Sequence, residues 1–238
     1  MGEVGMESKH YTLHEFASKN HLVEALKERI VSQLREVIAD KGYATLALSG
    51  GSTPKRLFQE LSEVPLKWER VYVTLVDERW VDASSDASNE KLVRENLLVN
   101  AAEKASFAPL KTSHTTAKEA VPVLCESMKK LFSELDVVVL GMGLDAHTAS
   151  FFPKTEELQE ALSTQEFVCA TTATVEPKER ITLSRSFLLT AKTLILHIEG
   201  VQKRSVFLEA TDSDDTEHMP IISMMLQEHP TLEVYYAE

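Results

Sequence analysis

The sequence predicts an α/β protein with a mostly parallel β-sheet that is covered by helices on both faces. Two observations lead to this fold class. Short apolar runs rich in β-branched residues, such as "DVVVL" and "TLILHIE", alternate along the chain with longer segments of helical periodicity. Most of these runs end in a glycine or polar turn, as strand–helix units of parallel sheets do.

The helices are predicted from their periodicity and from the residues that start and stop them. Apolar residues recur at every fourth position between Asn20 and Asp40, with Asn20 as the expected N-cap and Gly42 as the C-terminal stop. Pro54 is expected at the start of the next helix, and Pro122 either kinks a later helix or lies in its first turn. Helices are expected at residues 20–40, 54–61, 88–99, 117–133, 201–210 and 220–228.

The strands are predicted where apolar runs are bounded by turn residues. They are expected at residues 43–49, 70–77, 136–143, 167–172, 180–184, 193–199 and 232–237. The part of the chain before the first of them is expected to form one long helix. The polar stretch 209–218 is interpreted as a helix end and a surface loop, so the chain is predicted to be one domain, residues 1–238.

Composition limits the classes of function. The formal net charge of −12 argues against general binding to nucleic acid or to an anionic membrane surface. The sequence has no apolar run of 18 residues, and its N-terminus lacks the apolar core of a signal peptide. Its two cysteines, Cys125 and Cys169, are expected to be reduced thiols, so we expect a cytoplasmic protein. The sequence gives no indication of oligomeric state.

Unusual polar residues gather just after the ends of predicted strands. These clusters are residues 49–52, 77–79, 145–147 and 200–203. In open α/β sheets, ligands bind beyond the carboxyl ends of the strands. Residues far apart in the sequence are therefore expected to meet in one cleft.

The first cluster, "LSGGSTP", has features of a phosphate-binding turn. Gly50 and Gly51 would let backbone N–H groups approach an anion, Ser49 and Ser52 add hydroxyls, and a helix is expected to start next. A plain capped strand–helix turn explains the motif equally well. The spacing of a P-loop and that of the dinucleotide-binding fingerprint are both missing.

The basic candidates come from three separate segments. In "VDERW", Arg79 could hold a phosphate or carboxylate, or it could form a surface pair with Asp77 or Glu78. Arg180 and Lys203 are weak candidates individually, since lone basic residues are usually solvated. Together with the Ser-Gly-Gly turn, they could hold one phosphate.

The segment "GMGLDAHTASFFP" (residues 141–153) carries the candidate for acid–base chemistry. His147 is a possible general base, and Asp145 could orient it or hold a substrate hydroxyl. A metal site is weakly supported by two ligands at this spacing, and a structural histidine is the other alternative. Gly141 and Gly143 favour the catalytic interpretation, because they would leave bare backbone N–H groups beside the imidazole. No nucleophile elbow is present.

Taken together, these motifs resemble the 6-phosphogluconolactonase family over residues 10–236. The resemblance rests on "LALSGGSTP", "LVDERWV", "SNEKLVRENLL", "VVLGMGLDAHTASFFP", "ERITLS" and "LHIEGVQKR". It implies a modified Rossmann-like α/β fold, shared with glucosamine-6-phosphate deaminases and, more distantly, ribose-5-phosphate isomerases. It also implies hydrolysis of 6-phospho-D-glucono-1,5-lactone to 6-phospho-D-gluconate, the second step of the oxidative pentose phosphate pathway, with no cofactor and no metal.

The resemblance also implies roles for the site residues. His147 would be the general base, Asp145 would orient it, and backbone N–H groups near Gly141 to Gly143 would stabilise the oxyanion. The residues expected to bind the phosphosugar substrate or its phosphate are Ser49, Gly50, Gly51, Ser52, Asp77, Arg79, Gly141, Gly143, Arg180 and Lys203.

The chain departs from the family pattern at two positions, and two other functions are alternatives to lactone hydrolysis. Leu144 and Ala146 replace a usual proline and glycine, and a left-handed Ala146 would carry strain of about 1 kcal/mol. Glucosamine-6-phosphate deaminases resemble this chain but have a glutamate where Phe152 stands, and Phe152 cannot move a proton. A sugar-phosphate-sensing regulator would need a helix-turn-helix module, which the segment before the first strand does not provide.

Overall fold

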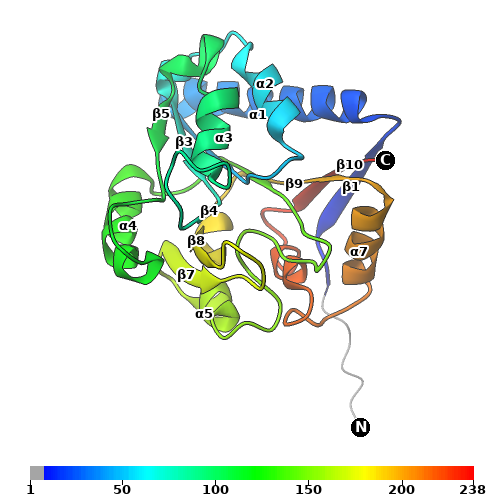
Figure 1. The fold of residues 1–238 in the computed structure, drawn as a ribbon. Coiled ribbons are helices and arrows are strands. Elements are labelled where there is room, and N and C mark those ends of the chain that lie inside the picture. Colours follow the sequence, from blue (N-terminus) through cyan, green and yellow to red (C-terminus); the bar gives the residue numbers. More distant parts are fainter. Residues whose placement is uncertain (1–7) are drawn as a thin grey trace.

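The computed structural model describes residues 8–238 (Figure 1). Its centre is a seven-stranded sheet in the order β1-β10-β9-β6-β2-β3-β5, and every pair of neighbours in it is parallel. This confirms the predicted mostly parallel sheet. The strands are β1 (Tyr11–Phe16), β2 (Ala44–Leu48), β3 (Val71–Leu75), β5 (Ser106–Ala108), β6 (Val137–Leu140), β9 (Thr193–Glu199) and β10 (Leu232–Ala237).

The central strands are those that the sequence marks most clearly. All residues of β2 and β6 are buried, and in β9 only Glu199 is not. A parallel strand with both faces covered has no polar face, which explains its continuous apolar run. The bounds of β9 and β10 match the predicted ranges, and β2 and β6 lie inside theirs.

Helices lie on both sides of this sheet. In Figure 1, α1, α2 and α3 lie on one side and α7 on the other. Helix α1 contacts β1, β2, β6 and β10, whereas α7 contacts β9. The helices are α1 (Lys19–Lys41), α2 (Lys55–Ser62), α3 (Asn89–Asn96), α4 (Ala117–Leu131), α5 (Leu158–Ser163), α6 (Arg185–Leu188) and α7 (Val201–Thr211). Pro122 lies inside α4, beyond its first turn.

A second sheet of three antiparallel strands lies beside the first. It consists of β4 (Asp77–Arg79), β8 (Glu179–Leu183) and β7 (Val168–Thr172), in the order β4-β8-β7, and α4 packs against β7 and β8. The prediction of one strand over 70–77 is therefore wrong. The chain leaves the main sheet after Leu75 and pairs Asp77 with Thr182 of β8.

The N-terminal segment differs from its prediction. Strand β1 precedes α1, so this segment is not a helix alone. The N-cap of α1 is Ser18, whose side chain accepts a hydrogen bond from His21 N, and not Asn20. Gly42 ends the helix in the left-handed conformation, as predicted. The prediction that no signal peptide is present concerns the N-terminus, of which residues 1–7 lie outside the described residues.

The helix predicted at 220–228 is a short 3-10 helix, Pro220–Met224, followed by turns. Its backbone groups bond to distant segments: Ile221 N donates to Ala146 O, and Met225 O accepts from His10 N. Local i→i−3 bonds, such as Ile222 N to Met219 O, and these tertiary bonds are present in place of an i→i−4 ladder. The short elements β5, α5 and α6 were not predicted.

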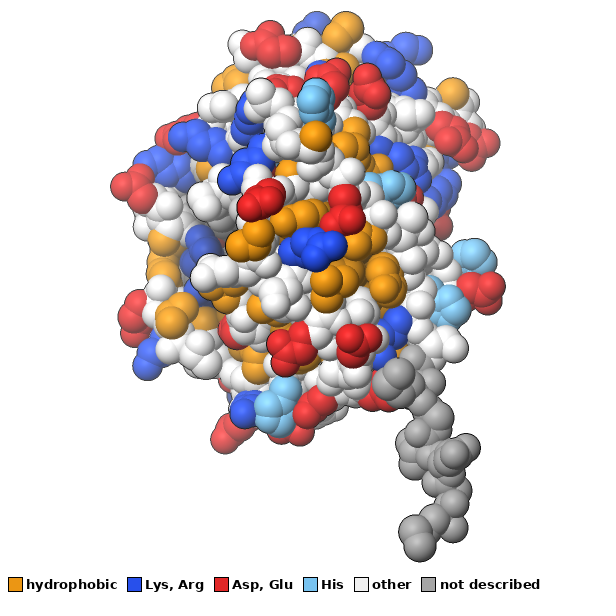
Figure 2. All heavy atoms as spheres, turned by 90° about the vertical axis from the view of Figure 1, so that its right-hand side faces the viewer, with side chains coloured by type: hydrophobic (Ala, Val, Ile, Leu, Met, Phe, Trp, Pro, Cys, Tyr) orange, Lys and Arg blue, Asp and Glu red, His pale blue; other side chains and the backbone are white. Residues whose placement is uncertain are grey.

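The surface mixes charges of both signs. On the face shown in Figure 2, acidic and basic side chains are interspersed around apolar side chains near the centre. In the described part of the chain, no helix is both long and apolar enough to cross a bilayer. The assignment of residues 1–238 to a single domain stays a prediction.

Candidate active site

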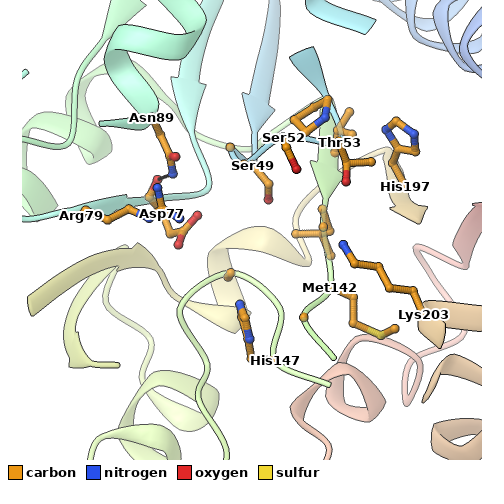
Figure 3. A pocket seen from close by; sticks show the side chains of 18 of the residues that line it. Ser49, Ser52, Thr53, Asp77, Arg79, Asn89, Met142, His147, His197 and Lys203 are labelled. Carbon is orange, nitrogen blue, oxygen red and sulfur yellow. Dashed lines mark hydrogen bonds between the residues drawn. The ribbon is translucent and has the colours of Figure 1, made fainter. Parts of the chain in front are cut away.

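A pocket of about 240 Å³ opens at the carboxyl ends of β2, β6 and β9 (Figure 3). It brings together residues that are more than 150 positions apart in the chain. Every candidate site residue named from the sequence lines it except Asp145, which contacts His147. The predicted residues that line it are Ser49, Gly50, Gly51, Ser52, Asp77, Arg79, Gly141, Gly143, His147, Arg180 and Lys203.

The Ser-Gly-Gly turn follows β2 and leads into α2. Gly51 has φ +95°, a conformation that favours glycine. Gly50 lies against Asn89, and a Cβ at this position would come within 1.9 Å of Asn89 Oδ1. Pro54 stands at the N-cap of α2 and provides no side-chain cap, so N–H groups of the first turn stay available to an anion.

Two arginines face each other across the small sheet. Arg79 of β4 is the register partner of Arg180 in β8. Arg79 Nη1 donates to Ala87 O at 2.8 Å, and Arg180 Nε donates to Pro177 O at 2.7 Å. Arg79 Nε has no hydrogen-bond partner within residues 8–238, and no ion pair joins Arg79 to Asp77 or Glu78 there, so the alternative of a surface ion pair is wrong for Arg79. Burial, and then the charge of Arg79, lowers the pKa of Arg180.

Glu78 fixes the segment between these arginines and α3. Its carboxylate is fully buried and accepts hydrogen bonds from Arg79 N, Asn89 N, Glu90 N and Ser88 Oγ. Burial raises the pKa of Glu78, and these four donors oppose the shift. The carboxylate thereby occupies the N-terminus of α3 and holds Asn89, whose Nδ2 donates to Asp77 O at 2.8 Å.

Asp77 lines the pocket, and only 8% of its surface is exposed. Its Oδ2 accepts a 2.6 Å hydrogen bond from Ser150 Oγ. This contact links the small sheet to the loop that carries His147. A fixed carboxylate at this place could accept hydrogen bonds from a ligand's hydroxyl groups.

The loop after β6 holds His147 against Asp145. His147 Nδ1 lies 2.5 Å from Asp145 Oδ1, which also accepts from His147 N at 3.2 Å. Burial raises the pKa of Asp145, but the hydrogen bonds and charge of His147 outweigh it, and the pKa is lowered overall. An ionised Asp145 holds the proton on Nδ1 and leaves Nε2 with a lone pair, as a general base requires.

Gly143 is required by this arrangement. A Cβ on it would come within 2.3 Å of two atoms of the His147 ring. Its own N–H donates to His147 O at 2.9 Å, so this one of the N–H groups near Gly141 to Gly143 is already engaged; stabilisation of an oxyanion by the others stays a prediction. Phe152 lies beside the imidazole with ring centroids 4.9 Å apart, and the Arg180 guanidinium lies 5.4 Å from the Phe152 ring.

Lys203 enters the pocket from the first turn of α7. Figure 3 shows its amine directed into the pocket, on the side of Ser52 and Thr53. Burial lowers the pKa of Lys203, and the charge of Glu199 opposes this shift. A partly buried amine and two partly desolvated guanidinium groups thus face one small volume, in a chain whose net charge is −12. An anionic ligand suits this local field.

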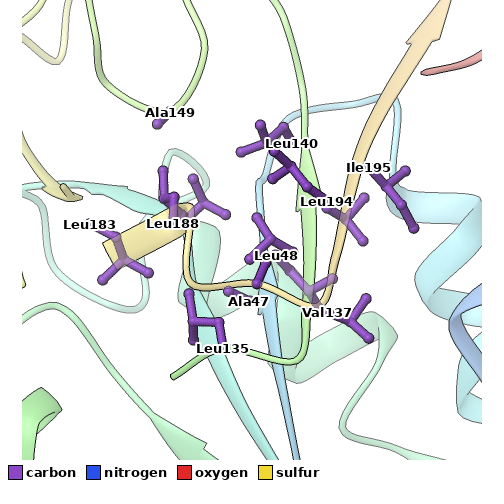
Figure 4. Packing of buried hydrophobic residues seen from close by; sticks show 14 of the residues in the cluster. Ala47, Leu48, Leu135, Val137, Leu140, Ala149, Leu183, Leu188, Leu194 and Ile195 are labelled. Carbon is purple, nitrogen blue, oxygen red and sulfur yellow. The ribbon is translucent and has the colours of Figure 1, made fainter. Parts of the chain in front are cut away.

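The pocket is supported by one continuous apolar cluster. Figure 4 shows Leu48, Val137 and Leu194 packed together beneath the ends of the strands. Leu183 of β8 and Leu188 of α6 belong to the same cluster and connect it to the small sheet. The site is therefore held by rigid elements, as precise catalytic geometry requires.

Some pocket residues were missed by the sequence analysis. They are Thr53, Pro54, Asn89, Val139, Leu140, Met142, Ala149 and His197. Asn89 and His197 carry polar groups, but they lie in a helix and a strand, not in the turns after strands. A signal for His197 was present, since it is the only polar residue between Thr193 and Glu199 in "TLILHIE".

The described residues give little support to metal-dependent or cysteine-based chemistry at this site. No group of three or more His, Cys, Asp or Glu side chains among them is placed to hold a metal ion. Cys125 and Cys169 are free and buried, and burial raises the pKa of Cys169 to about 12. These thiols therefore stay protonated, and neither lines the pocket.

Comparison with known proteins gives a consistent result. A family model described as glucosamine-6-phosphate isomerases/6-phosphogluconolactonase matches residues 17–232. The 6-phosphogluconolactonase of Rhizobium meliloti (strain 1021) is 43% identical over 227 residues, which cover 94% of this chain and 98% of that protein. The 6-phosphogluconolactonase of Neisseria meningitidis (strain MC58) is 34% identical over 231 residues, 96% of this chain and 100% of the relative.

Solved structures agree with these relatives. The crystal structure of a 6-phosphogluconolactonase from Shewanella baltica OS155 superposes with a TM-score of 0.94 at 44% identity, covering 98% of this chain and 100% of that one. The 6-phosphogluconolactonase of Thermotoga maritima has a TM-score of 0.80 at 24% identity over 95% of this chain and 99% of that one, a likeness of fold alone.

Proposed function

Because the chain belongs to the family of glucosamine-6-phosphate isomerases and 6-phosphogluconolactonases, we propose that it hydrolyses 6-phospho-D-glucono-1,5-lactone to 6-phospho-D-gluconate. This reaction is the second step of the oxidative pentose phosphate pathway. The observation that carries the proposal is the His147–Asp145 pair at a pocket lined by three cationic side chains and a glycine-rich turn. The His147–Asp145 pair provides a general base. The cationic side chains and the glycine-rich turn provide a binding place for a phosphorylated anion.

In the reaction, His147 acts through Nε2. It takes a proton from a water molecule as the water oxygen bonds to C1 of the lactone. The tetrahedral intermediate then collapses, the bond from C1 to the ring oxygen breaks, and His147 returns the proton to that oxygen. Asp145 holds the imidazole in the required tautomer and stabilises the imidazolium that forms between the two steps.

The two sides of the pocket suggest how the substrate lies. In Figure 3, Asp77 and Arg79 lie on the side of His147, whereas Ser52, Thr53 and Lys203 lie on the other. We assign the phosphate to the side with Ser52 and Lys203. Arg180 and its register partner Arg79 then serve as the charge sink for the developing oxyanion, since the Arg180 guanidinium lies over Phe152, which packs beside His147.

The deaminase alternative lacks a proton carrier at a key place. Phe152 packs against the His147 ring where deaminases resemble this chain but have a glutamate, and only 3% of Phe152 is exposed. Moving protons between carbon atoms needs several acid–base groups, whereas lactone hydrolysis needs one base and a charge sink. Independence from metals and cofactors, a cytoplasmic location and the lack of nucleic-acid partners stay predictions.

The test is lactonase activity on freshly generated 6-phosphogluconolactone, with the product coupled to 6-phosphogluconate dehydrogenase. The uncatalysed rate is measured without enzyme and subtracted. We expect His147→Ala to lower kcat by roughly 10²–10⁴-fold, the usual contribution of a general base.

A matched control is His218→Ala, since His218 is an exposed histidine outside the pocket that pairs with Asp215. This variant should keep the activity of the unchanged protein. A wild-type rate equal to the blank would refute the proposed function, and a loss under tenfold in folded His147→Ala would refute the assignment of the base.

A further inference from the structure

His197 is a polar side chain of the pocket that the mechanism above does not use. It lies in β9 within a run of buried apolar residues, and only 2% of it is exposed. It lines the pocket, and Figure 3 shows its ring beside Thr53, on the same side of the pocket as Lys203. Burying an imidazole costs free energy unless its nitrogens are hydrogen-bonded, so the partner of each nitrogen is informative.

One ring nitrogen has a partner. His197 Nε2 lies 3.1 Å from Glu199 Oε1, and Glu199 lies 3.4 Å from Lys19 Nζ. The hydrogen bond from His197 lowers the pKa of Glu199 and outweighs the opposing effect of burial. Glu199 is therefore a carboxylate that accepts the proton of Nε2, and the tautomer of His197 is set.

The other ring nitrogen, Nδ1, is buried and has no hydrogen-bond partner within residues 8–238. Two further atoms of residues that line this pocket, Ser49 Oγ and Arg79 Nε, are also buried and without a hydrogen-bond partner there. Unsatisfied polar atoms are rare in folded proteins. Of the five buried side-chain atoms without a hydrogen-bond partner in the described residues, three belong to residues that line this pocket, which indicates contacts that a ligand completes; the other two are Asp136 Oδ1 and Thr171 Oγ1.

Resting on the proposed function, we propose that Nδ1 of His197 hydrogen-bonds to the phosphoryl group of the substrate. His197 is thereby a specificity-determining residue, which favours phosphorylated over unphosphorylated lactones. The reason is its place: Thr53 and Lys203, next to it in the pocket, are on the side assigned to the phosphate, whereas His147 marks the side of the reacting carbonyl.

The hydrogen bond needs one proton between Nδ1 and a phosphoryl oxygen. An imidazolium donates it to a dianionic phosphoryl group, or a monoprotonated phosphoryl group donates it to the neutral imidazole. The charged groups near His197 are Glu199, 3.1 Å from Nε2, Lys19, 3.4 Å from Glu199, and Lys203, which lines the same pocket.

Two substitutions distinguish the contribution of Nδ1 from that of Nε2. In His197→Gln the amide reaches toward Glu199 and nothing replaces Nδ1, whereas in His197→Asn the amide takes the place of Nδ1 and the contact with Glu199 is lost. Steady-state kinetics are measured with 6-phosphoglucono-1,5-lactone and with glucono-1,5-lactone. We expect His197→Gln to raise KM for the phosphorylated lactone about tenfold and to leave kcat within twofold.

The unphosphorylated lactone is the internal control. Its kcat/KM should be the same in His197→Gln as in the unchanged protein, and His197→Asn should raise KM for the phosphorylated lactone less than His197→Gln does. Equal losses on both lactones would overturn the proposal, because they would indicate a structural role or a contact with the sugar hydroxyls.

A binding measurement keeps this inference separate from the proposed function. Inorganic phosphate is titrated calorimetrically into the unchanged protein and into His197→Gln. Weaker binding to the variant supports the phosphate contact even for a protein without lactonase activity. Equal binding to both proteins, or no binding to either, refutes the contact whatever the activity.

Discussion

Ala146, beside the proposed base, combines a strained backbone with a buried side chain. Its φ is +63°, a left-handed conformation that costs an L-residue about 1–2 kcal/mol. Its methyl group is almost completely buried, at 1% exposure, which contributes about 0.8 kcal/mol. Alanine also restricts the unfolded chain more than glycine does, which favours the folded state by roughly 0.4–1 kcal/mol. Burial and chain entropy therefore offset the strain, and the alanine is tolerated where the family usually has glycine.

This balance predicts a small effect for the residue that would remove the strain. Ala146→Gly should change the free energy of unfolding by less than about 0.5 kcal/mol. Ala146→Val should lower it by roughly 2 kcal/mol or more, because a β-branched side chain fits the left-handed region poorly. Urea denaturation of the three proteins provides the values. A gain above about 1 kcal/mol in Ala146→Gly would show that the methyl group contributes nothing.

At the scale of elements, the start of α3 depends on Glu78. The helix has its own N-cap, Ser88, but the Ser88 hydroxyl also donates to Glu78, as do the N–H groups of Asn89 and Glu90. A carboxylate from another strand thus completes the cap. Since Asn89 lies directly against Gly50, the same contact sets the position of the glycine turn at the pocket.

Glu78→Gln is predicted to destabilise the protein by roughly 2–3 kcal/mol, because an amide NH₂ would face N–H donors in a buried place. Glu95→Gln is the matched control. Glu95 lies on the same helix, but its side chain is exposed and its ion pair with Lys91 Nζ is long at 3.9 Å. The control should change stability by less than about 0.5 kcal/mol. Similar effects of the two changes in thermal denaturation would mean that the buried cap is not important.

The elements also show what the sequence can reveal. Runs such as "VVVL" were predictable because a strand buried on both faces must be apolar throughout. Strand β1 was missed because an edge strand is only half buried, and its pattern is weak next to the strong helix that follows. Strand β4 was missed because three residues take this form only through pairing with β8, about 100 positions away.

The same reasoning explains which site residues were found. Candidates in glycine turns after strands were visible, because the topology directs those turns to one edge of the sheet. Asn89 and His197 lie inside regular elements, where a polar residue has an ordinary structural explanation. The availability of individual donors also depends on tertiary contacts, as the hydrogen bond from Gly143 N to His147 O shows.

Across the whole molecule, stability and activity depend on opposite ends of the sheet. The pocket lies at the carboxyl ends of the strands, whereas Asp136 lies just before β6, at the amino ends. Asp136 is completely buried, accepts hydrogen bonds from Thr45 N and Thr45 Oγ1, and lies 2.8 Å from Lys41 Nζ. It is thus a buried charge with several partners and no contact with the site.

Asp136→Ala should therefore lower the stability of the protein and leave its activity unchanged. Removing this carboxylate is expected to cost roughly 2–4 kcal/mol, because Thr45 N and Thr45 Oγ1 lose their buried acceptor and Lys41 keeps, among the described residues, only its ion pair with Glu134. At a temperature where the variant is folded, kcat/KM should stay within about twofold of the unchanged protein, since the carboxyl edge of the sheet is intact. Denaturation and steady-state kinetics on one preparation measure both quantities. A large fall in kcat/KM with folding intact would contradict the separation.

The pairing of β1 with β10 has a consequence for how the protein is made. Within residues 8–238, strand β1 pairs only with β10, the last described strand, through the register from Tyr11–Leu232 to Phe16–Ala237. A ribosome adding about 5–20 residues per second needs roughly 10–40 s to make the intervening chain. Throughout that time the first strand has no partner, and the edge of β9 that later receives β10 stays open. The nascent chain therefore completes this sheet only after residues 232–237 have been made, and a chain that stops before residue 232 exposes both edges to aggregation.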